Sequence, residues 1–203
     1  MATMSDQTGK GTLLVVTGPS GAGKGTVLGR VLPAFDRLHY SISATTRKPR
    51  PGETDGKSYY FLTHEQFRAM IDGDELLEYA EYVGNYYGTP AAPVERELAA
   101  GNDVVLEIEV QGALMVKKKR PDAVLVFIIP PEFSLLEQRL RGRGSEPDDV
   151  IARRLEKARS EYKCGDRYDY IVINDDLEQA VKELSSILIA QRCKTEKRIE
   201  LLR

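Results

Sequence analysis

The sequence has few of the residues that build disulfide frameworks and protein metal centres. Its 203 residues include two cysteines, Cys164 and Cys193, which lie far apart and form no Cys-x-x-Cys pair. This spacing argues against a disulfide scaffold or a zinc site, and we expect a cytoplasmic protein in a reducing environment. The two histidines, His39 and His64, form no ligand constellation. We expect both to be ordinary residues of the surface or its boundary.

The chain also lacks long apolar runs and a large excess of one charge. No uninterrupted apolar run approaches the roughly 20 residues that a membrane-spanning helix needs. The formal net charge is -2 at pH 7, which argues against a nucleic-acid coat because binding to the phosphate backbone requires a basic face. Residues 1–10 carry no apolar segment or cleavage signature and are interpreted as a flexible polar tail. We therefore expect neither a membrane nor a nucleic acid as a partner.

Four short apolar runs predict the strands of a central sheet. They are rich in β-branched residues and largely unalternating, which is typical of parallel strands buried on both faces. The runs span residues 13–17, 104–110, 124–129 and 170–173. Helical patterns lie between and after them, and the clearest is an apolar stripe made of Leu177, Val181, Leu184, Ile187 and Leu188. This alternation predicts an α/β fold in which helices flank a parallel sheet.

Residues 43–89 depart from that alternation. They are rich in Tyr, Gly, Thr and charged residues, with strand-like pieces at residues 59–61 and 76–83. A helix is expected to begin at Thr63, because Gln66 three residues later completes a capping box. We therefore predict a small inserted α+β subdomain between the first helix and the second core strand.

A second irregular segment, residues 142–148, joins two arginine-bearing helical patterns and predicts a short lid at about 140–154. The tail of residues 1–10 then precedes one domain of residues 11–203. The core of that domain is assigned to residues 11–42, 90–139 and 155–203.

A glycine-rich loop follows the first predicted strand and opens a helical pattern. Its glycines let successive backbone N–H groups converge on phosphate oxygens, and the helix N-terminus adds positive potential. Lys24 supplies a mobile charge for the β- and γ-phosphates. Gly25 stands where Ser or Thr usually contacts Mg²⁺. We predict a P-loop that binds a nucleoside triphosphate through Gly18, Pro19, Ser20, Gly21, Ala22, Gly23, Lys24, Gly25 and Thr26.

Two arginines in the inserted segment suit a second phosphate. Arg47 and Arg50 are three residues apart and are followed by Tyr59. The planar guanidinium fork matches a dianionic phosphate better than the point charge of lysine. On the spacing of the two arginines alone, however, a solvated basic turn is the preferred interpretation.

With these motifs in family order, the sequence resembles the bacterial-type guanylate kinases, the nucleoside monophosphate kinases that make GDP from GMP and ATP. The resemblance covers about residues 13–190, and the segment after Gln191 adds nothing to it. Such kinases often carry Lys-Gly-Thr in the P-loop, so Gly25 fits. The segments that carry the resemblance are 18–26, 45–59, 84–89, 107–112, 139–144 and 172–175.

The resemblance implies a P-loop NTPase-type parallel sheet flanked by helices, with a GMP-binding insertion at 43–89 and a lid that close over the substrates. It implies transfer of the γ-phosphoryl group of ATP to GMP in purine nucleotide metabolism. ATP and GMP would be the small-molecule partners, and Mg²⁺ the cofactor. The oligomeric state stays open.

Acceptor residues follow from the resemblance. The family holds the acceptor phosphate with residues matching Arg47, Arg50, Tyr59 and Tyr87. It reads guanine with residues matching Ser43, Glu78 and Thr89, with the residue matching Glu109 nearby. A carboxylate at Glu78 accepts from both N1–H and the exocyclic amine of guanine, which adenine cannot offer. Without the resemblance, Glu78 would be interpreted as a solvent-facing strand residue.

The resemblance likewise implies that Arg139, Arg143 and Arg154 act with Lys24 on the transferring phosphoryl group. Arg139 and Arg143 share a helix face if the helix continues that far. Phosphoryl transfer requires positioning and positive charge, and no general base is nominated. Asn174 matches a position near the ATP base. Arg153, Lys157 and Arg159 are interpreted as solvated helix charges.

The triphosphate is expected to hold Mg²⁺ mainly by itself, with Glu107 or Glu109 orienting its water molecules. Strand alternation would place both carboxylates on one face, so the sequence does not choose between them.

Two alternatives remain. One is a non-catalytic guanylate-kinase-like module that binds phosphopeptides, and the intact P-loop with Lys24 argues against it. The other is a kinase for a different nucleoside monophosphate, and the pairing of Ser43 with Glu78 argues against that.

Overall fold

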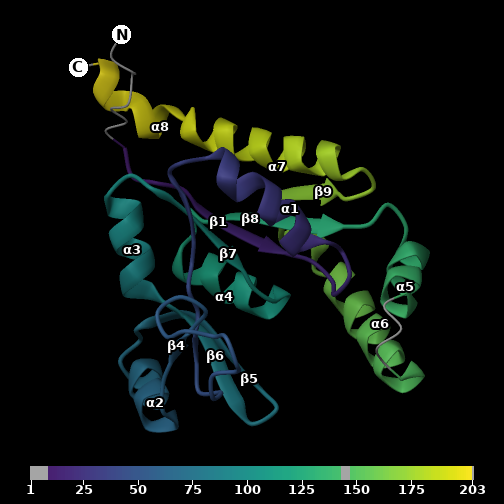
Figure 1. The fold of residues 1–203 in the computed structure, drawn as a ribbon. Coiled ribbons are helices and arrows are strands. Elements are labelled where there is room, and N and C mark those ends of the chain that lie inside the picture. Colours follow the sequence, from purple (N-terminus) through teal and green to yellow (C-terminus); the bar gives the residue numbers. More distant parts are fainter. Residues whose placement is uncertain (1–8, 143–146, 203) are drawn as a thin grey trace.

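The computed structural model describes residues 9–142 and 147–202 (Figure 1). In this part of the chain a five-stranded sheet has the order β2-β7-β1-β8-β9, and every adjacent pair is parallel. Its strands are β1 (Leu13–Thr17), β2 (Leu38–Tyr40), β7 (Asp103–Glu107), β8 (Val124–Ile129) and β9 (Tyr170–Ile173).

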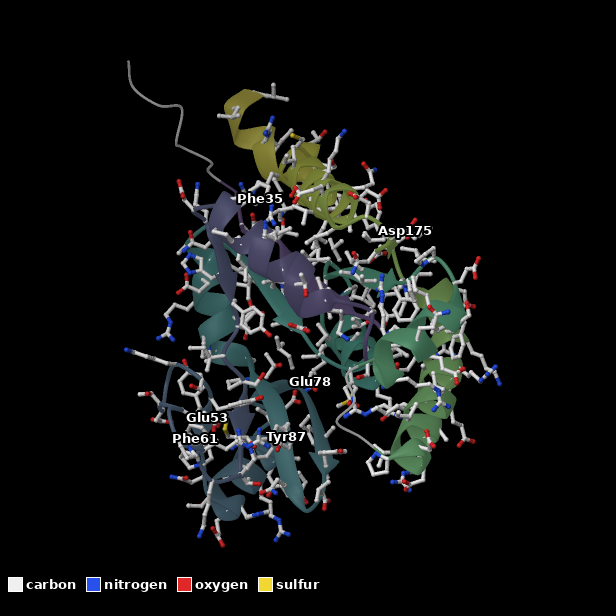
Figure 2. The ribbon with its side chains drawn as sticks, turned by 45° about the vertical axis from the view of Figure 1, so that its right-hand side comes forward. Phe35, Glu53, Phe61, Glu78, Tyr87 and Asp175 are labelled. Carbon is white, nitrogen blue, oxygen red and sulfur yellow. The ribbon has the colours of Figure 1, made fainter. Side chains whose placement is uncertain are left out.

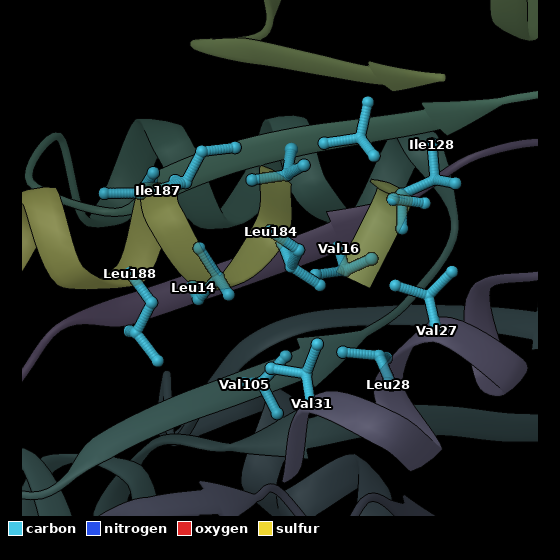
Figure 3. Packing of buried hydrophobic residues seen from close by; sticks show 14 of the residues in the cluster. Leu14, Val16, Val27, Leu28, Val31, Val105, Ile128, Leu184, Ile187 and Leu188 are labelled. Atoms are coloured by element: carbon cyan, nitrogen blue, oxygen red, sulfur yellow. The ribbon is translucent and has the colours of Figure 1, made fainter. Parts of the chain in front are cut away.

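Helices cover both faces of this sheet because its strands bury alternate side chains on opposite sides. They are α1 (Lys24–Val31), α3 (Ala91–Ala99), α4 (Val110–Lys119) and α7 (Leu177–Arg192). Leu14 and Val16 of β1 point to the face packed by α1 and α7, as Figure 3 shows. Leu13 and Val15 point to the opposite face, packed by α3 and α4. The predicted α/β arrangement is confirmed.

The prediction of burial on both faces was wrong for β9. Ile171 is 53% exposed and Ile173 is 49% exposed, whereas Val172 between them is buried. β9 lies at the edge of the sheet, where β8 is its neighbour among the described strands. The opposite edge is β2, a strand of three residues that lacks an apolar run and was not predicted from the sequence.

A second sheet is formed by residues of the inserted segment, in the order β4-β3-β6-β5. Its elements are β3 (Ala44–Thr45), β4 (Tyr60–Phe61), α2 (His64–Asp72), β5 (Leu76–Tyr82) and β6 (Asn85–Pro90). The capping box of α2 is confirmed: the Thr63 hydroxyl accepts from the Gln66 N–H, and the Gln66 side chain accepts from the Thr63 N–H. β5 and β6 form a hairpin whose turn contains Val83 and Gly84, both at positive φ.

Two further helices, α5 (Phe133–Arg141) and α6 (Asp148–Tyr162), pack on each other through a small apolar cluster. Figure 1 places them at one end of the sheet, beside the P-loop end of α1. Short elements complete the described chain: η1 (Leu32–Ala34), η2 (Gly165–Arg167), α8 (Thr195–Arg198) and η3 (Ile199–Leu202). Across residues 9–142 and 147–202, no helix combines the length and apolar character needed to cross a bilayer.

Candidate active site

The P-loop connects β1 to α1, and its backbone has positive φ at Gly18, Gly21 and Gly23, a conformation that favours glycine. Gly18 has φ 145°, and a Cβ added there would lie 2.1 Å from the Ile128 carbonyl oxygen. Gly23 has φ 91°, and an added Cβ would lie 2.3 Å from the Asn174 side-chain nitrogen. These approaches hold the loop against β8 and the chain after β9.

Lys24 folds back over this loop. Its ammonium group donates to the carbonyl oxygens of Gly18, at 2.7 Å, and Pro19, at 3.3 Å. Burial lowers the pKa of Lys24, and the charges of Glu107 and Glu161 oppose that shift. A cation held at the loop in this way lies where the β- and γ-phosphates of a bound triphosphate are expected.

A cavity of about 320 Å³ lies next to the loop. Arg154 reaches it from α6, and its guanidinium donates to the Ser20 hydroxyl at 3.2 Å. The lining side chains include two further charged groups of α6, Lys157 and Glu161, neither of which was predicted to belong to the site. The sequence signal that could have placed them in the site is their spacing. They follow Arg154 by three and seven residues, which puts all three side chains on one helix face. We call this space the donor cavity.

Asn174 and Arg139 join the P-loop to the end of β9. The buried Asn174 side chain donates to the Ala22 carbonyl at 2.7 Å. Arg139 donates to the Asn174 carbonyl at 3.0 Å. Asn174 therefore supports the loop directly, in addition to any contact with a base. α5 ends at Arg141, so the condition that its helix continue to Arg143 is not met, and Arg143 lies outside the described residues.

A second cavity of about 290 Å³, the acceptor cavity, lies between the inserted sheet and the core. Of the predicted acceptor residues it brings together five: Ser43, Tyr59, Glu78, Tyr87 and Glu109.

Glu78 is only 7% exposed, so the interpretation as a solvent-facing strand residue is wrong. The Thr89 hydroxyl donates to its carboxylate at 2.7 Å, which brings a sixth predicted residue to the site. Burial raises the pKa of Glu78. α4 also approaches closely, because a Cβ added at Gly112 would lie 2.7 Å from the same carboxylate. Figure 2 shows Glu78 at the junction of the inserted segment and the core.

Arg47 is held by a residue that was not predicted from the sequence, Glu53. Two parallel bonds of 2.9 Å join the guanidinium to the Glu53 carboxylate, which also accepts from the Arg50 backbone N–H at 2.7 Å. These bonds raise the pKa of Arg47 and lower that of Glu53. Arg47 also lies over the Tyr59 ring, 5.4 Å from its centroid, and Tyr87 packs edge-on against Tyr59. The Arg50 side chain is exposed.

Glu107 and Glu109 do not share a strand face, contrary to the prediction. β7 ends at Glu107, and Glu109 is the N-cap residue of α4, because the chain turns into a helix at Val110. The Tyr40 hydroxyl donates to Glu107 at 3.2 Å, whereas Lys157 donates to Glu109 at 2.7 Å. The two carboxylates therefore have different partners from different elements.

The two cavities adjoin, because residues 107–109 line both. A donor nucleotide held by the P-loop and an acceptor held beside Glu78 would thus approach each other across the end of β7. This arrangement suits direct transfer of a group between two bound molecules.

The family profile described as "Guanylate kinase" matches residues 10–191. The chain belongs to the guanylate kinase family. The guanylate kinase of Desulfitobacterium hafniense is 50% identical over 93% of this chain and 94% of its own length. That of Thermus thermophilus is 55% identical over 90% of this chain and 83% of its own length.

A solved structure of guanylate kinase from Anaplasma phagocytophilum superposes with a TM-score of 0.72 at 32% identity, covering 93% of this chain and 90% of that one. The guanylate kinase fold, a parallel sheet flanked by helices, is therefore confirmed for this chain, as is the family membership expected from its motifs.

Proposed function

We propose that this chain transfers the γ-phosphoryl group of ATP to GMP, giving ADP and GDP, as an enzyme of purine nucleotide metabolism. The observation that carries the proposal is the buried carboxylate of Glu78 in a cavity that adjoins the one containing Lys24. A buried hydrogen-bonding group that is satisfied by one base and left unpaired by another is a strong basis for selection.

Glu78 is proposed to read guanine. Its carboxylate accepts two parallel N–H bonds from N1 and the exocyclic amine, while Thr89 holds one of its oxygens. Ser43 and Glu109 line the same cavity and are proposed to contact the base or its immediate surroundings. Adenine presents an acceptor at N1 and cannot supply these two parallel N–H bonds.

The acceptor phosphate is proposed to lie against Arg47, Arg50, Tyr59 and Tyr87. Glu53 fixes the plane of the Arg47 guanidinium before GMP arrives. Such pre-organisation lowers the entropy lost when the phosphate binds. The exposed Arg50 side chain is able to close on the phosphate from the solvent side.

Transfer is proposed to depend on Lys24, Arg139, Arg143 and Arg154. The backbone N–H groups of residues 18–26 and Lys24 hold the triphosphate, and the arginines place positive charge around the transferring group. Phosphoryl transfer of this kind is catalysed by in-line positioning and electrostatic stabilisation, so no residue is assigned as a general base. The role of Arg143 rests on the resemblance alone.

Mg²⁺ is the cofactor that this chemistry implies, and Glu107 fits it best. An added Cβ at Gly25 would lie 4.0 Å from the Glu107 carboxylate, which therefore lies beside the residue that replaces the usual P-loop hydroxyl. Within the described residues, no group of three or more His, Cys, Asp or Glu side chains is placed to hold a metal. We propose that ATP supplies most ligands and that Glu107 orients the water molecules on the ion, whose charge offsets that of the phosphates.

Closure of the inserted segment 43–89 and of a lid at about 140–154 is proposed to exclude water and suppress ATP hydrolysis.

Cys164 and Cys193 are free thiols, which fits the cytoplasm as the compartment.

The test is formation of ADP by the purified chain with Mg·ATP and, in parallel, GMP, AMP, CMP or UMP. Turnover with GMP at least about 10³ times faster than with AMP is expected from the paired recognition. Comparable turnover with another monophosphate would overturn the assignment of the acceptor. Absence of turnover from protein that still binds GMP would favour the non-catalytic binding module.

A further inference from the structure

Helix α6 presents one polar face to the donor cavity. Arg154, Lys157 and Glu161 follow one another at helical spacing, and all three line that cavity. Arg153 of the same helix does not line that cavity; it pairs with Asp149 one turn earlier and is 70% exposed. The helix therefore carries cations that face the site and a neighbouring cation that faces solvent.

Lys157 connects this helix to the boundary between the two cavities. Its ammonium group donates at 2.7 Å to Glu109, 48 residues earlier in the sequence. Lys157 lines the donor cavity, whereas Glu109 lines both cavities. The ion pair thus joins a helix of the donor side to a carboxylate of the acceptor side.

The ion pair is poorly suited to stabilise the fold. The side chains of Lys157 and Glu109 are 51% and 64% exposed, and pairs of this kind contribute little free energy of folding. Lys157 belongs to α6, whereas Glu109 is the N-cap residue of α4. The charge beside Glu109 therefore depends on where α6 lies, and so does the orientation of the Glu109 carboxylate.

We propose that Lys157 is a positioning residue for the acceptor: it orients Glu109 toward bound GMP and thereby couples GMP binding to the placement of α6. This rests on the acceptor role proposed above for Glu109. A ligand shifts a conformational equilibrium only by contacts that differ between the two states, and here the differing contact is the Lys157–Glu109 bond. Because such coupling is reciprocal, GMP favours the placement of α6 in which Lys157 reaches Glu109.

The test is a double-mutant cycle on GMP. Lys157→Gln is expected to raise the KM and the dissociation constant for GMP by about 2- to 5-fold, the effect of one exposed ion pair, and to leave the KM for ATP unchanged. In a Glu109→Gln background, Lys157→Gln should add nothing, because its partner is already absent. Lys157→Arg, which keeps the charge, should restore wild-type values.

Arg153→Gln is the matched control, because it removes one positive charge from another residue of α6. It should leave the GMP constants unchanged. The proposal is contradicted by equal effects of Lys157→Gln with and without Glu109, by an equal effect of Arg153→Gln, or by an effect on the KM for ATP alone. The last result would place Lys157 on the donor phosphates.

This cycle is separable from the test of the function itself. Wild-type turnover with GMP decides the proposed function before any variant is made. Thermal unfolding of each variant checks folding, and the exposed ion pair predicts nearly unchanged melting temperatures. If the wild-type chain turns over GMP but the cycle shows no coupling between Lys157 and Glu109, the role of Lys157 is rejected and the proposed function still holds.

Discussion

The donor and acceptor cavities are built by different means. The P-loop of the donor side is a backbone structure: it follows a strand, has positive φ at Gly18, Gly21 and Gly23, and leads into a helix N-terminus. The acceptor side is a side-chain structure, in which Glu78 from β5 meets Thr89 from β6 against Gly112 of α4. The P-loop is specified within nine consecutive residues, whereas the acceptor cavity requires the tertiary fold.

This difference has a functional consequence. A backbone cradle binds phosphate, which every nucleoside triphosphate carries, so it provides charge and position without reading a base. A buried carboxylate tolerates only a ligand that pairs with it. We therefore expect variants of the donor side to lose rate and variants of the acceptor side to lose selectivity.

The largest effect is expected at Lys24. Replacement by Ala should lower kcat by about 10³-fold or more, because charge on the transferring group is the main contribution of protein in phosphoryl transfer. GMP binding should persist, since Lys24 is outside the acceptor cavity. Steady-state kinetics measures the change, and Lys182→Ala on the exposed side of α7 is the control. Full activity of Lys24→Ala would contradict the P-loop assignment.

The next effect is expected at Glu78. Glu78→Gln should raise the KM for GMP by roughly 10²-fold, because the amide replaces one acceptor by a donor facing guanine N–H groups. The KM for ATP should be unaffected. Glu81→Gln, an exposed carboxylate on the same strand, should match wild type. Equal effects of the two variants would reject Glu78 as the base reader.

A smaller effect is expected at Glu53. Glu53→Gln should raise the KM for GMP by about 3- to 10-fold, because Arg47 loses a charge-assisted, two-bond partner that fixes its orientation. Phosphate recognition should weaken without a change in the preference for guanine. The ratio of kcat/KM for GMP to that for AMP provides the check, since it should stay constant while both values fall.

The smallest effect concerns stability and pH. Burial raises the pKa of Glu78, so the folded state binds its proton more tightly than the unfolded state. The stabilisation that results is complete below the usual glutamate pKa and is lost as pH rises through the raised value. Glu78→Gln should therefore unfold at a higher temperature than wild type at pH 8, with a difference that shrinks toward pH 4. If the difference in unfolding temperature between Glu78→Gln and wild type grows as the pH falls, the raised pKa of Glu78 is contradicted.

The local features of this fold were predictable from the sequence. The P-loop, the Thr63 capping box and most core strands depend on residues close together in the chain, and each was found where expected. The exposed side chains of β9 were not anticipated, because an edge strand is defined by the order of strands and an apolar run does not reveal that order.

The partners of the site residues were the part that sequence could not supply. Lys157 meets Glu109 and Tyr40 meets Glu107 across 48 and 67 residues. The expectation that Glu107 and Glu109 face the same way assumed a continuous strand. It failed because the strand ends at Glu107 and a helix begins three residues later, at Val110.

The most direct test of the account is GMP binding without ATP, measured by titration calorimetry on Lys24→Ala, Glu78→Gln and the wild-type chain. We expect wild-type affinity for Lys24→Ala and a loss of roughly 10²-fold for Glu78→Gln, because only Glu78 belongs to the acceptor cavity. The opposite pattern, with GMP binding lost in Lys24→Ala and retained in Glu78→Gln, would contradict the separation of the two sites.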